Sequence, residues 1–168
     1  MLNVRFAAVL AASLGLAVPA VGQETAAAAP VRDADWHNRQ QLFLYALPAA
    51  EGWRWTASGL RYRKIGGTEA GPRPAPTDTV TIHYVGRFID GTEFDSSVAR
   101  GEPATFPLPR LIRGWQEGVP LMSVGERFEF AIPARLGYGY EGRGPIPGGA
   151  TLLFTVELIA VAGAAPDG

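Results

Sequence analysis

The pentapeptide "EFDSS", residues 93–97, combines three kinds of side chain that can do chemistry. A carboxylate, Asp95, follows the aromatic Phe94 and precedes the hydroxyls of Ser96 and Ser97. Such a set can serve acid–base catalysis, bind a metal, supply a serine nucleophile or wire a turn by hydrogen bonds. Each of these roles needs different partner residues, so the rest of the chain must distinguish between them.

The metal and nucleophile roles lack partners in this sequence. The only histidines, His37 and His83, are far apart, and there are no cysteines. The acids nearest to Asp95 lie at 90 and 93 in a predicted hairpin, where carboxylates usually face water. No G-x-S-x-G elbow is present for a serine nucleophile. The sequence therefore predicts no metal site, no cofactor and no serine hydrolase.

Composition excludes a further class of function. The 168 residues carry 15 basic and 16 acidic side chains and a net charge of −1. A nucleic-acid-binding protein needs a basic face for phosphate contacts, and we predict no nucleic-acid partner.

The N-terminus has the three parts of a secretory signal peptide. Arg5 precedes an apolar run at 6–18, and small residues follow it up to Gly22. The run is shorter than the ~20 residues that span a bilayer. We expect residues 1–22 to be a cleaved signal peptide and the protein to be periplasmic or secreted.

Residues 23–51 are expected to form a linker and a short helical extension. The helix is predicted over 33–47, with Asp33 or Asp35 as its N-cap, and it ends before Pro48 and Gly52. Because a helix this short is marginal alone, we expect it to rest on the domain that follows. Its predicted apolar side consists of Trp36, Leu42, Phe43 and Leu47.

Residues 52–161 show short alternating strands separated by Gly/Pro turns, and 162–168 are expected to be a disordered tail. Strands are predicted over 79–88, 127–133 and 151–159, with a hairpin turn at 90–91 and one short helix within 110–122. These elements predict an α+β fold in which one antiparallel sheet is covered by a single short helix.

Two apolar residues stand in unusual places. Tyr138 lies in a glycine-rich loop, and Ile146 lies between two prolines. Apolar side chains on rigid loops near a carboxylate suggest an apolar pocket with a polar lip, as ligand sites have.

The motifs "VTIHYVGRFIDGTEFDSS", "LIRGWQEGVPLMSVGERFEFAIP", "LGYGYEG" and "IPGGATLLFTVEL" occur in one order over about residues 58–159. In this the chain resembles the FK506-binding-protein (FKBP) family of peptidyl-prolyl cis-trans isomerases, in particular its exported bacterial members. The resemblance implies a sheet half-wrapped around a short helix and isomerisation of X–Pro bonds in proline-containing unfolded or nascent polypeptides. It also implies macrolide inhibitors of the FK506 type as ligands. Some exported members carry a long helical dimerisation region, but only 23–57 precede the domain here, and we expect a monomer.

The resemblance also implies the site. Asp95 and Tyr138 are its catalytic residues, and Trp115 is the floor of its pocket. The backbone N–H of Ile112 and the hydroxyl of Tyr138 are expected to bond ligand carbonyls. The implied substrate-binding residues are Tyr84, Phe94, Leu111, Ile112, Trp115, Ile146 and Phe154.

For Asp95 two interpretations stay open at this point. It organises the pocket wall by accepting hydrogen bonds from Tyr84 and a neighbouring donor, or it stabilises the hairpin by accepting hydrogen bonds from the backbone N–H groups of Ser96 and Ser97. The chain departs from the best-known members at Ala104, in place of a pocket Phe, and at "IPGG". These departures leave an alternative function open, an FKBP-fold chaperone or binding module with weak or no isomerase activity.

Overall fold

The computed structural model describes residues 32–69 and 71–162. The predicted signal peptide, almost all of the predicted linker and residues 163–168 of the predicted tail lie outside these residues. In the part of the chain described, no helix combines the length and apolar character needed to cross a membrane.

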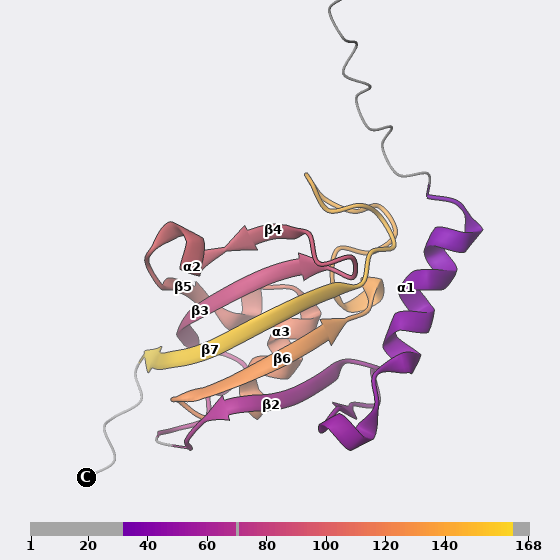
Figure 1. The fold of residues 1–168 in the computed structure, drawn as a ribbon. Helices are drawn as coiled ribbons and strands as arrows, with labels where there is room; N and C mark the ends of the chain where they lie inside the picture. Colours follow the sequence, from indigo (N-terminus) through magenta and orange to yellow (C-terminus); the bar gives the residue numbers. More distant parts are fainter. Residues whose placement is uncertain (1–31, 70, 163–168) are drawn as a thin grey trace, which may run out of the picture. The chain divides into compact units, whose positions relative to one another are not determined.

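A single antiparallel sheet forms the body of this region (Figure 1). Its order is β1-β2-β6-β7-β3-β4, and β5 pairs with β3 beside β4. The predicted α+β class with an antiparallel sheet is confirmed. The strands are β1 (Arg54–Trp55), β2 (Arg61–Gly67), β3 (Thr79–Phe88), β4 (Glu93–Ser96), β5 (Ala104–Pro107), β6 (Glu126–Ile132) and β7 (Leu152–Ala162).

The three predicted strands correspond to β3, β6 and β7, and their predicted inward faces are confirmed. Alternate side chains on each strand point into one core, as the period of two requires. The predicted turn at 90–91 joins β3 to β4, with Gly91 at a φ of 88°. The inward residues are Val80, Ile82, Tyr84, Phe128, Phe130, Ile132, Leu152, Phe154, Val156 and Leu158, each no more than 7% exposed.

The predicted helix within 110–122 is shorter than expected. It is α3 (Arg113–Gly118), between the 3-10 turns η2 (Leu108–Arg110) and η3 (Val119–Leu121). Pro120 has no N–H for an α-helical hydrogen bond, and the chain tightens into η3 at that point. Two further 3-10 turns are η1 (Ala49–Glu51) and η4 (Ala134–Leu136).

Glycines on α3 let this helix lie close against β6. A Cβ at Gly114 would stand 2.6 Å from Cγ2 of Ile132, and a Cβ at Gly118 would stand 2.7 Å from Cε1 of Phe130. The two glycines are four residues apart and therefore on one face of the helix. Their lack of side chains sets the depth at which α3 packs, and so the position of Trp115 between them.

A second short helix, α2 (Ser97–Arg100), was not predicted. Ser96 caps it, because its Oγ accepts the backbone N–H of Ala99 at 3.0 Å. Gly101 ends it with a φ of 79°, in the left-handed region that glycine adopts freely. The turn places Arg100 beside the end of β4.

The N-terminal extension forms α1 (Ala34–Ala46), and Asp33 caps it through a 2.8 Å bond from the Trp36 N–H. As expected, the helix rests on the domain. Leu44 packs with Trp53 and Ala131, and Ala131 alternates with the inward residues of β6, so α1 lies against the sheet face opposite α3.

The predicted apolar side of this helix was wrong at Leu42, which is 64% exposed. The position buried in its place is Gln40. The Gln40 Oε1 accepts the Thr151 N–H at 2.9 Å, and the Thr151 hydroxyl donates to the Gln40 carbonyl at 3.1 Å. A polar residue with satisfied hydrogen bonds thus occupies the buried stripe and joins α1 to the start of β7.

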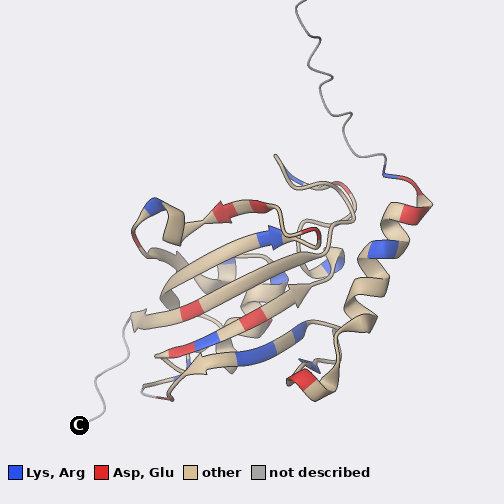
Figure 2. Cartoon of the chain, in the orientation of Figure 1, with Lys and Arg blue, Asp and Glu red and all other residues tan. Residues whose placement is uncertain are grey.

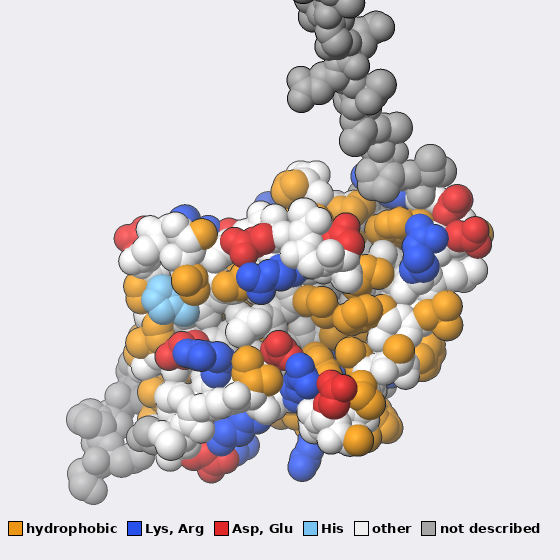
Figure 3. All heavy atoms as spheres, viewed as in Figure 1, with side chains coloured by type: hydrophobic (Ala, Val, Ile, Leu, Met, Phe, Trp, Pro, Cys, Tyr) orange, Lys and Arg blue, Asp and Glu red, His pale blue; other side chains and the backbone are white. Residues whose placement is uncertain are grey.

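The sheet face beside α1 is otherwise charged and partly open. Opposite charges face each other on neighbouring strands, as in Arg63–Glu129 and Arg127–Glu157, both at 2.7 Å (Figure 2). Apolar side chains gather between these strands and α1 (Figure 3). The chemistry-bearing residues of the hairpin lie elsewhere, toward the α3 side of the sheet.

Candidate functional site

A cavity of about 300 Å³ opens between α3, the β3–β4 hairpin and the loop after η4. Eight of the nine predicted site residues line it. The ninth, Ile146, lines an adjoining hollow that shares Phe94, Asp95 and Tyr138 with the first. The cavity is lined by Tyr84, Phe94, Asp95, Phe106, Arg110, Leu111, Ile112, Trp115, Tyr138, Arg143 and Phe154.

Aromatic rings standing edge to face form its apolar part. The Trp115 ring lies 5.3 Å from that of Tyr84 and 5.1 Å from that of Phe154, at interplanar angles of 80° and 85°. Phe94 meets Phe154 at 5.6 Å and 88°. These are favourable aromatic geometries, so the rings stabilise one another's positions around the cavity.

Trp115 lies beneath this cavity and is 4% exposed. Its indole nitrogen finds no hydrogen-bond partner in the described part of the chain. Trp115 therefore contributes to the cavity as an apolar surface, and removing its N–H breaks no hydrogen bond between described residues.

Gly86 on β3 makes room for two of these rings. A Cβ there would stand 2.7 Å from Cε2 of Phe94 and 2.8 Å from Cε1 of Phe154. Real Cβ atoms almost never approach so closely, so any larger residue would displace one of the rings. The register pairs Gly86 with Asp95 on one side and with Phe154 on the other.

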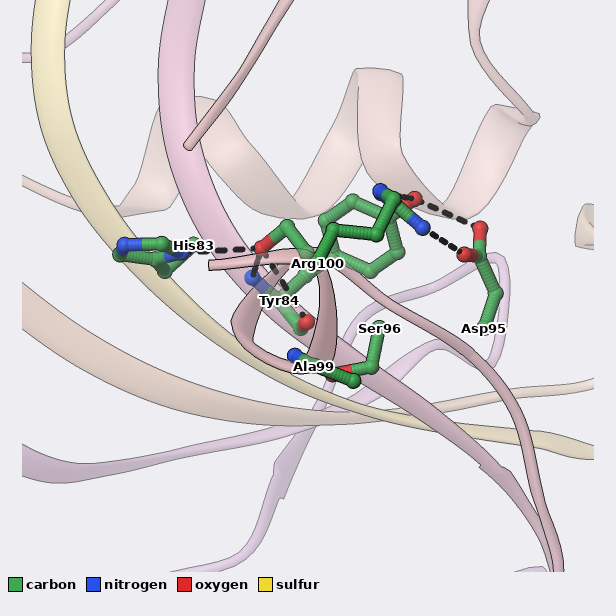
Figure 4. Close-up of polar contacts among 7 residues, drawn as sticks. His83, Tyr84, Asp95, Ser96, Ala99 and Arg100 are labelled. Atoms are coloured by element: carbon green, nitrogen blue, oxygen red, sulfur yellow. Dashed lines mark hydrogen bonds and ion pairs between the residues drawn. The ribbon is translucent and has the colours of Figure 1, made fainter. Parts of the chain in front are cut away.

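The carboxylate of Asp95 is held by two side chains (Figure 4). Its Oδ2 accepts the Tyr84 hydroxyl at 2.6 Å, and its Oδ1 accepts the Arg100 guanidinium at 2.5 Å. A second nitrogen of Arg100 donates to the Tyr84 oxygen at 2.9 Å, and the guanidinium lies 5.5 Å from the Tyr84 ring centre. Strands β3 and β4 and helix α2 each supply one member of this triangle.

The triangle shifts the pKa values of its members. Partial desolvation acts to raise the pKa of Asp95, but the hydrogen bonds from Tyr84 and Arg100 outweigh it and hold the pKa below 3.8. Burial, and then the bond to Asp95, raise the pKa of Tyr84 above 10.0. At neutral pH the carboxylate is therefore ionised and the phenol protonated, and Arg100 balances the charge.

His83 and Ser97 do meet, although not as a catalytic pair. Nδ1 of His83 lies 3.0 Å from Oγ of Ser97. This hydroxyl is fully buried, accepts the Tyr84 N–H at 2.8 Å and donates to the Tyr84 carbonyl at 3.3 Å. A substrate cannot reach it, and its role is to fix the backbone beside Tyr84.

The loop between η4 and β7 supplies the polar lip. It folds back on itself, because Arg143 and Ile146 exchange two backbone hydrogen bonds of 2.9 Å and Gly149 donates to the Gly139 carbonyl at 2.9 Å. A Cβ on Gly148 would run into the Tyr140 carbonyl, so the first glycine of "IPGG" lets the loop close at this point.

Two polar groups at the cavity have no protein partner in the described residues. Neither the backbone N–H of Ile112 nor the hydroxyl of Tyr138 is hydrogen-bonded to residues 32–69 or 71–162. Both residues line the cavity. These are the groups expected to bond ligand carbonyls, and the geometry leaves them available.

Four residues of this region were absent from the predicted site set: Phe106, Arg110 and Arg143, which line the cavity, and Arg100, which holds Asp95. Ala104, the departure from the family pattern, lies on β5 opposite Ile82 and does not line the cavity. Phe106, two residues on and on the same side of β5, lines it instead. Because side chains alternate between the two sides of a strand, the sequence of residues 104–107 places Phe106 on the same side of β5 as Ala104, and this alternation was the signal available for it.

Within the described residues, no three His, Cys, Asp or Glu side chains gather in a group fit to hold a metal ion. The cavity itself presents apolar surfaces, the Asp95 carboxylate and the side chains of Arg110 and Arg143.

Comparison with known proteins agrees with this arrangement. Residues 71–159 match the family model described as FKBP-type peptidyl-prolyl cis-trans isomerase. The FKBP-type peptidyl-prolyl cis-trans isomerase FkpA of Aeromonas hydrophila is 50% identical over 133 residues, which are 78% of this chain and 48% of that protein. The FKBP-type 22 kDa isomerase of Escherichia coli is 53% identical over 112 residues, 66% of this chain and 54% of that protein. The chain thus spans about half the length of these curated relatives.

Solved structures share the fold. The crystal structure of FkpA from Escherichia coli superposes with a TM-score of 0.73 at 37% identity, over 76% of this chain and 60% of that one. An isomerase structure from Pseudomonas syringae superposes with a TM-score of 0.70 at 32% identity, over 79% and 98% of the two chains.

Proposed function

This chain belongs to the FKBP-type peptidyl-prolyl cis-trans isomerase family, and on that premise we propose that it accelerates rotation about X–Pro bonds in unfolded or nascent polypeptides. The observation that carries the proposal is the aromatic cavity floored by Trp115, with free hydrogen-bonding groups at its lip.

The reaction needs no nucleophile or cofactor. Amide resonance holds the X–Pro bond behind a barrier of about 18–20 kcal/mol, and unaided rotation takes tens to hundreds of seconds. A twisted amide has lost this resonance, and its carbonyl is less polar than in the planar form. An apolar cavity therefore favours the twisted state, which is differential binding of the transition state.

Burial alone does not explain a large acceleration. A factor of about a million requires about 8 kcal/mol of transition-state stabilisation. We assign the remainder to positioning. In this assignment Phe94, Trp115 and Phe154 enclose the proline ring, while the Ile112 N–H and the Tyr138 hydroxyl hold the flanking carbonyls, so that rotation proceeds before dissociation.

Asp95 acts in this proposal as an organiser of the cavity wall, through its bonds to Tyr84 and Arg100. We predict that Asp95→Asn lowers kcat/KM by less than about tenfold, a loss of under about 1.4 kcal/mol, because the amide oxygen can still accept one of the two bonds. Asp90→Asn, in the hairpin turn, is the matched control and should leave kcat/KM unchanged. Abolished activity in a folded Asp95→Asn variant would assign the carboxylate a direct part in rotation.

A proline-limited refolding reaction tests the function. The slow phase of a model protein should accelerate in proportion to the concentration of this protein. An unchanged slow phase at micromolar protein would overturn the isomerase proposal. An unchanged slow phase with a higher refolded yield would support the alternative, a chaperone or binding module, which the departures from the family pattern at Ala104 and "IPGG" leave open.

We further propose that residues 1–22 direct export to the periplasm or outside the cell, that 23–51 and 52–161 are the extension and the isomerase domain, and that the protein acts as a monomer. Macrolides of the FK506 type are proposed inhibitors of the cavity. Supporting the export proposal is the charged, apolar and small-residue order of 1–22.

A further inference from the structure

The mouth of the cavity carries positively charged side chains to which the proposed isomerisation assigns no role. Arg110 and Arg143 both line it, and Asp95 is the only acid among the described residues of the lining. Arg100 already neutralises that carboxylate. Two guanidinium groups remain uncompensated at the mouth, on a chain whose net charge is −1.

Neither arginine forms an ion pair with a carboxylate of the described residues. In the described ranges 32–69 and 71–162, no carboxylate lies within 4 Å of the guanidinium of Arg110 or Arg143. Another acid of the hairpin, Glu93, is paired with Arg87 at 3.1 Å. Arg100, by contrast, forms its ion pair with Asp95, the acid that lines the same cavity.

The backbone that carries each arginine is fixed. Arg143 is held by its paired hydrogen bonds to Ile146. Arg110 ends η2, where Leu111 donates to the Leu108 carbonyl at 3.1 Å and the Gln116 amide donates to the Leu111 carbonyl at 2.6 Å. The two side chains therefore start from set positions in different segments that meet at the same cavity.

We propose that Arg110 and Arg143 are specificity-determining residues, which select X–Pro bonds with an acidic side chain within about two residues of the proline. An extended chain rises about 3.3 Å per residue, so side chains at that separation lie at the mouth when the ring fills the cavity. Carboxylates match the donor geometry of arginine, and the uncompensated charge raises the local concentration of acidic segments. This inference rests on the proposed isomerase function and names its substrate class.

The test uses the full chain and pairs of end-blocked peptides, each with one X–Pro bond, that differ only by Glu or Gln at one position near the proline. Exchange NMR gives kcat and KM for both members of a pair. We expect the Glu peptide to show about fivefold higher kcat/KM at low salt, through KM, because exposed ion pairs are weak. At about 0.5 M salt the ratio should approach one.

Variants assign the effect to these residues. Arg110→Gln/Arg143→Gln should bring the Glu-to-Gln ratio close to one, and Arg143→Glu should favour peptides carrying Lys at the same position. Arg54→Gln is the matched control, because Arg54 is exposed on β1, at the edge of the sheet farthest from β4. It should keep the wild-type ratio.

Two failures are distinguishable. If the wild type isomerises both peptides equally at every position, or if the double Gln variant keeps the wild-type ratio, the specificity inference is overturned and the proposed function stands. If neither peptide is isomerised, the proposed function falls and the inference falls with it.

Discussion

Trp115→Ala should lower kcat/KM by about 100-fold, equivalent to about 2.7 kcal/mol of transition-state stabilisation. Trp115 touches the rings of Tyr84, Phe106 and Phe154 at centroid distances of 5.3, 6.4 and 5.1 Å. Its removal opens the bottom of the cavity, so the twisted amide is no longer surrounded by apolar surface. The refolding reaction and a single-proline peptide both report this loss.

The same change should also destabilise the fold, because Trp→Ala in a core typically costs about 3–5 kcal/mol and Trp115 is 4% exposed. Trp115→Phe separates the two effects. It keeps an aromatic floor and loses an N–H that has no partner in the described part of the chain, so it should retain most of the stability and more of the activity than the Ala variant.

Trp55→Ala is the matched control for this experiment. Trp55 is 62% exposed on β1, where Arg61 lies 5.4 Å from its ring. Its truncation should leave isomerisation unchanged and cost little stability. Full activity in a folded Trp115→Ala variant would contradict a catalytic contribution from the cavity floor.

Strand positions were predictable from the sequence because their cause is local. Alternation of apolar residues in 79–88, 127–133 and 151–159 is enough to set which side of each strand is buried. The turn at 90–91 was likewise predictable, since Gly91 adopts a positive φ that most other residues avoid.

Helices were less predictable because their burial depends on distant partners. Gln40 can be buried because its side-chain oxygen accepts a hydrogen bond from the Thr151 N–H. Nothing near Gln40 in the sequence signals this partner, which lies 111 residues away. For the same reason Leu42 was wrongly assigned to the apolar side. The four-residue α2 is too short to produce a periodic pattern.

The candidate site likewise contains residues that the sequence predicted and residues that it did not. Its predicted residues were named through motifs in the correct order, and the structure brings eight of them, with Asp95 among these, to one cavity. The arginines were not named. An exposed arginine in a loop has no pattern of its own, and whether it has an acidic partner is decided only by the folded chain.

At the other end of the sheet, an ion pair between a buried carboxylate and a partly exposed lysine is also expected to contribute to stability. Glu126, at the start of β6, is 1% exposed. Its Oε1 lies 2.5 Å from Nζ of Lys64, and its Oε2 accepts the Ser123 N–H at 2.7 Å. Glu126→Ala leaves a buried N–H without an acceptor, and we expect a loss of about 2–3 kcal/mol in the free energy of unfolding, measured by urea denaturation.

Glu157→Ala provides the comparison, because Glu157 forms an exposed pair with Arg127 at a similar separation, 2.7 Å. Exposed pairs contribute about 0–1 kcal/mol. A loss from Glu157→Ala as large as that from Glu126→Ala would show that burial does not decide how much these two pairs contribute.

The pH dependence of stability distinguishes charge from hydrogen bonding at Glu126. Desolvation acts to raise the pKa of this carboxyl, but the hydrogen bonds from Lys64 and Ser123 outweigh it and lower the pKa below 4.5. The folded state therefore binds the proton less tightly than the unfolded state. The stabilisation is present above pH 4.5 and is lost as the pH falls through the folded-state pKa.

Glu126→Gln keeps an acceptor for the Ser123 N–H and cannot titrate. Other carboxyls, Asp95 among them, also lose stabilisation in acid, so the informative quantity is the difference in unfolding free energy between wild type and this variant. That difference should be largest at neutral pH and should shrink below pH 4.5. A difference that stayed constant with pH would show that the charge of Glu126 contributes nothing and that its stabilising effect lies in the hydrogen bond to Ser123 alone.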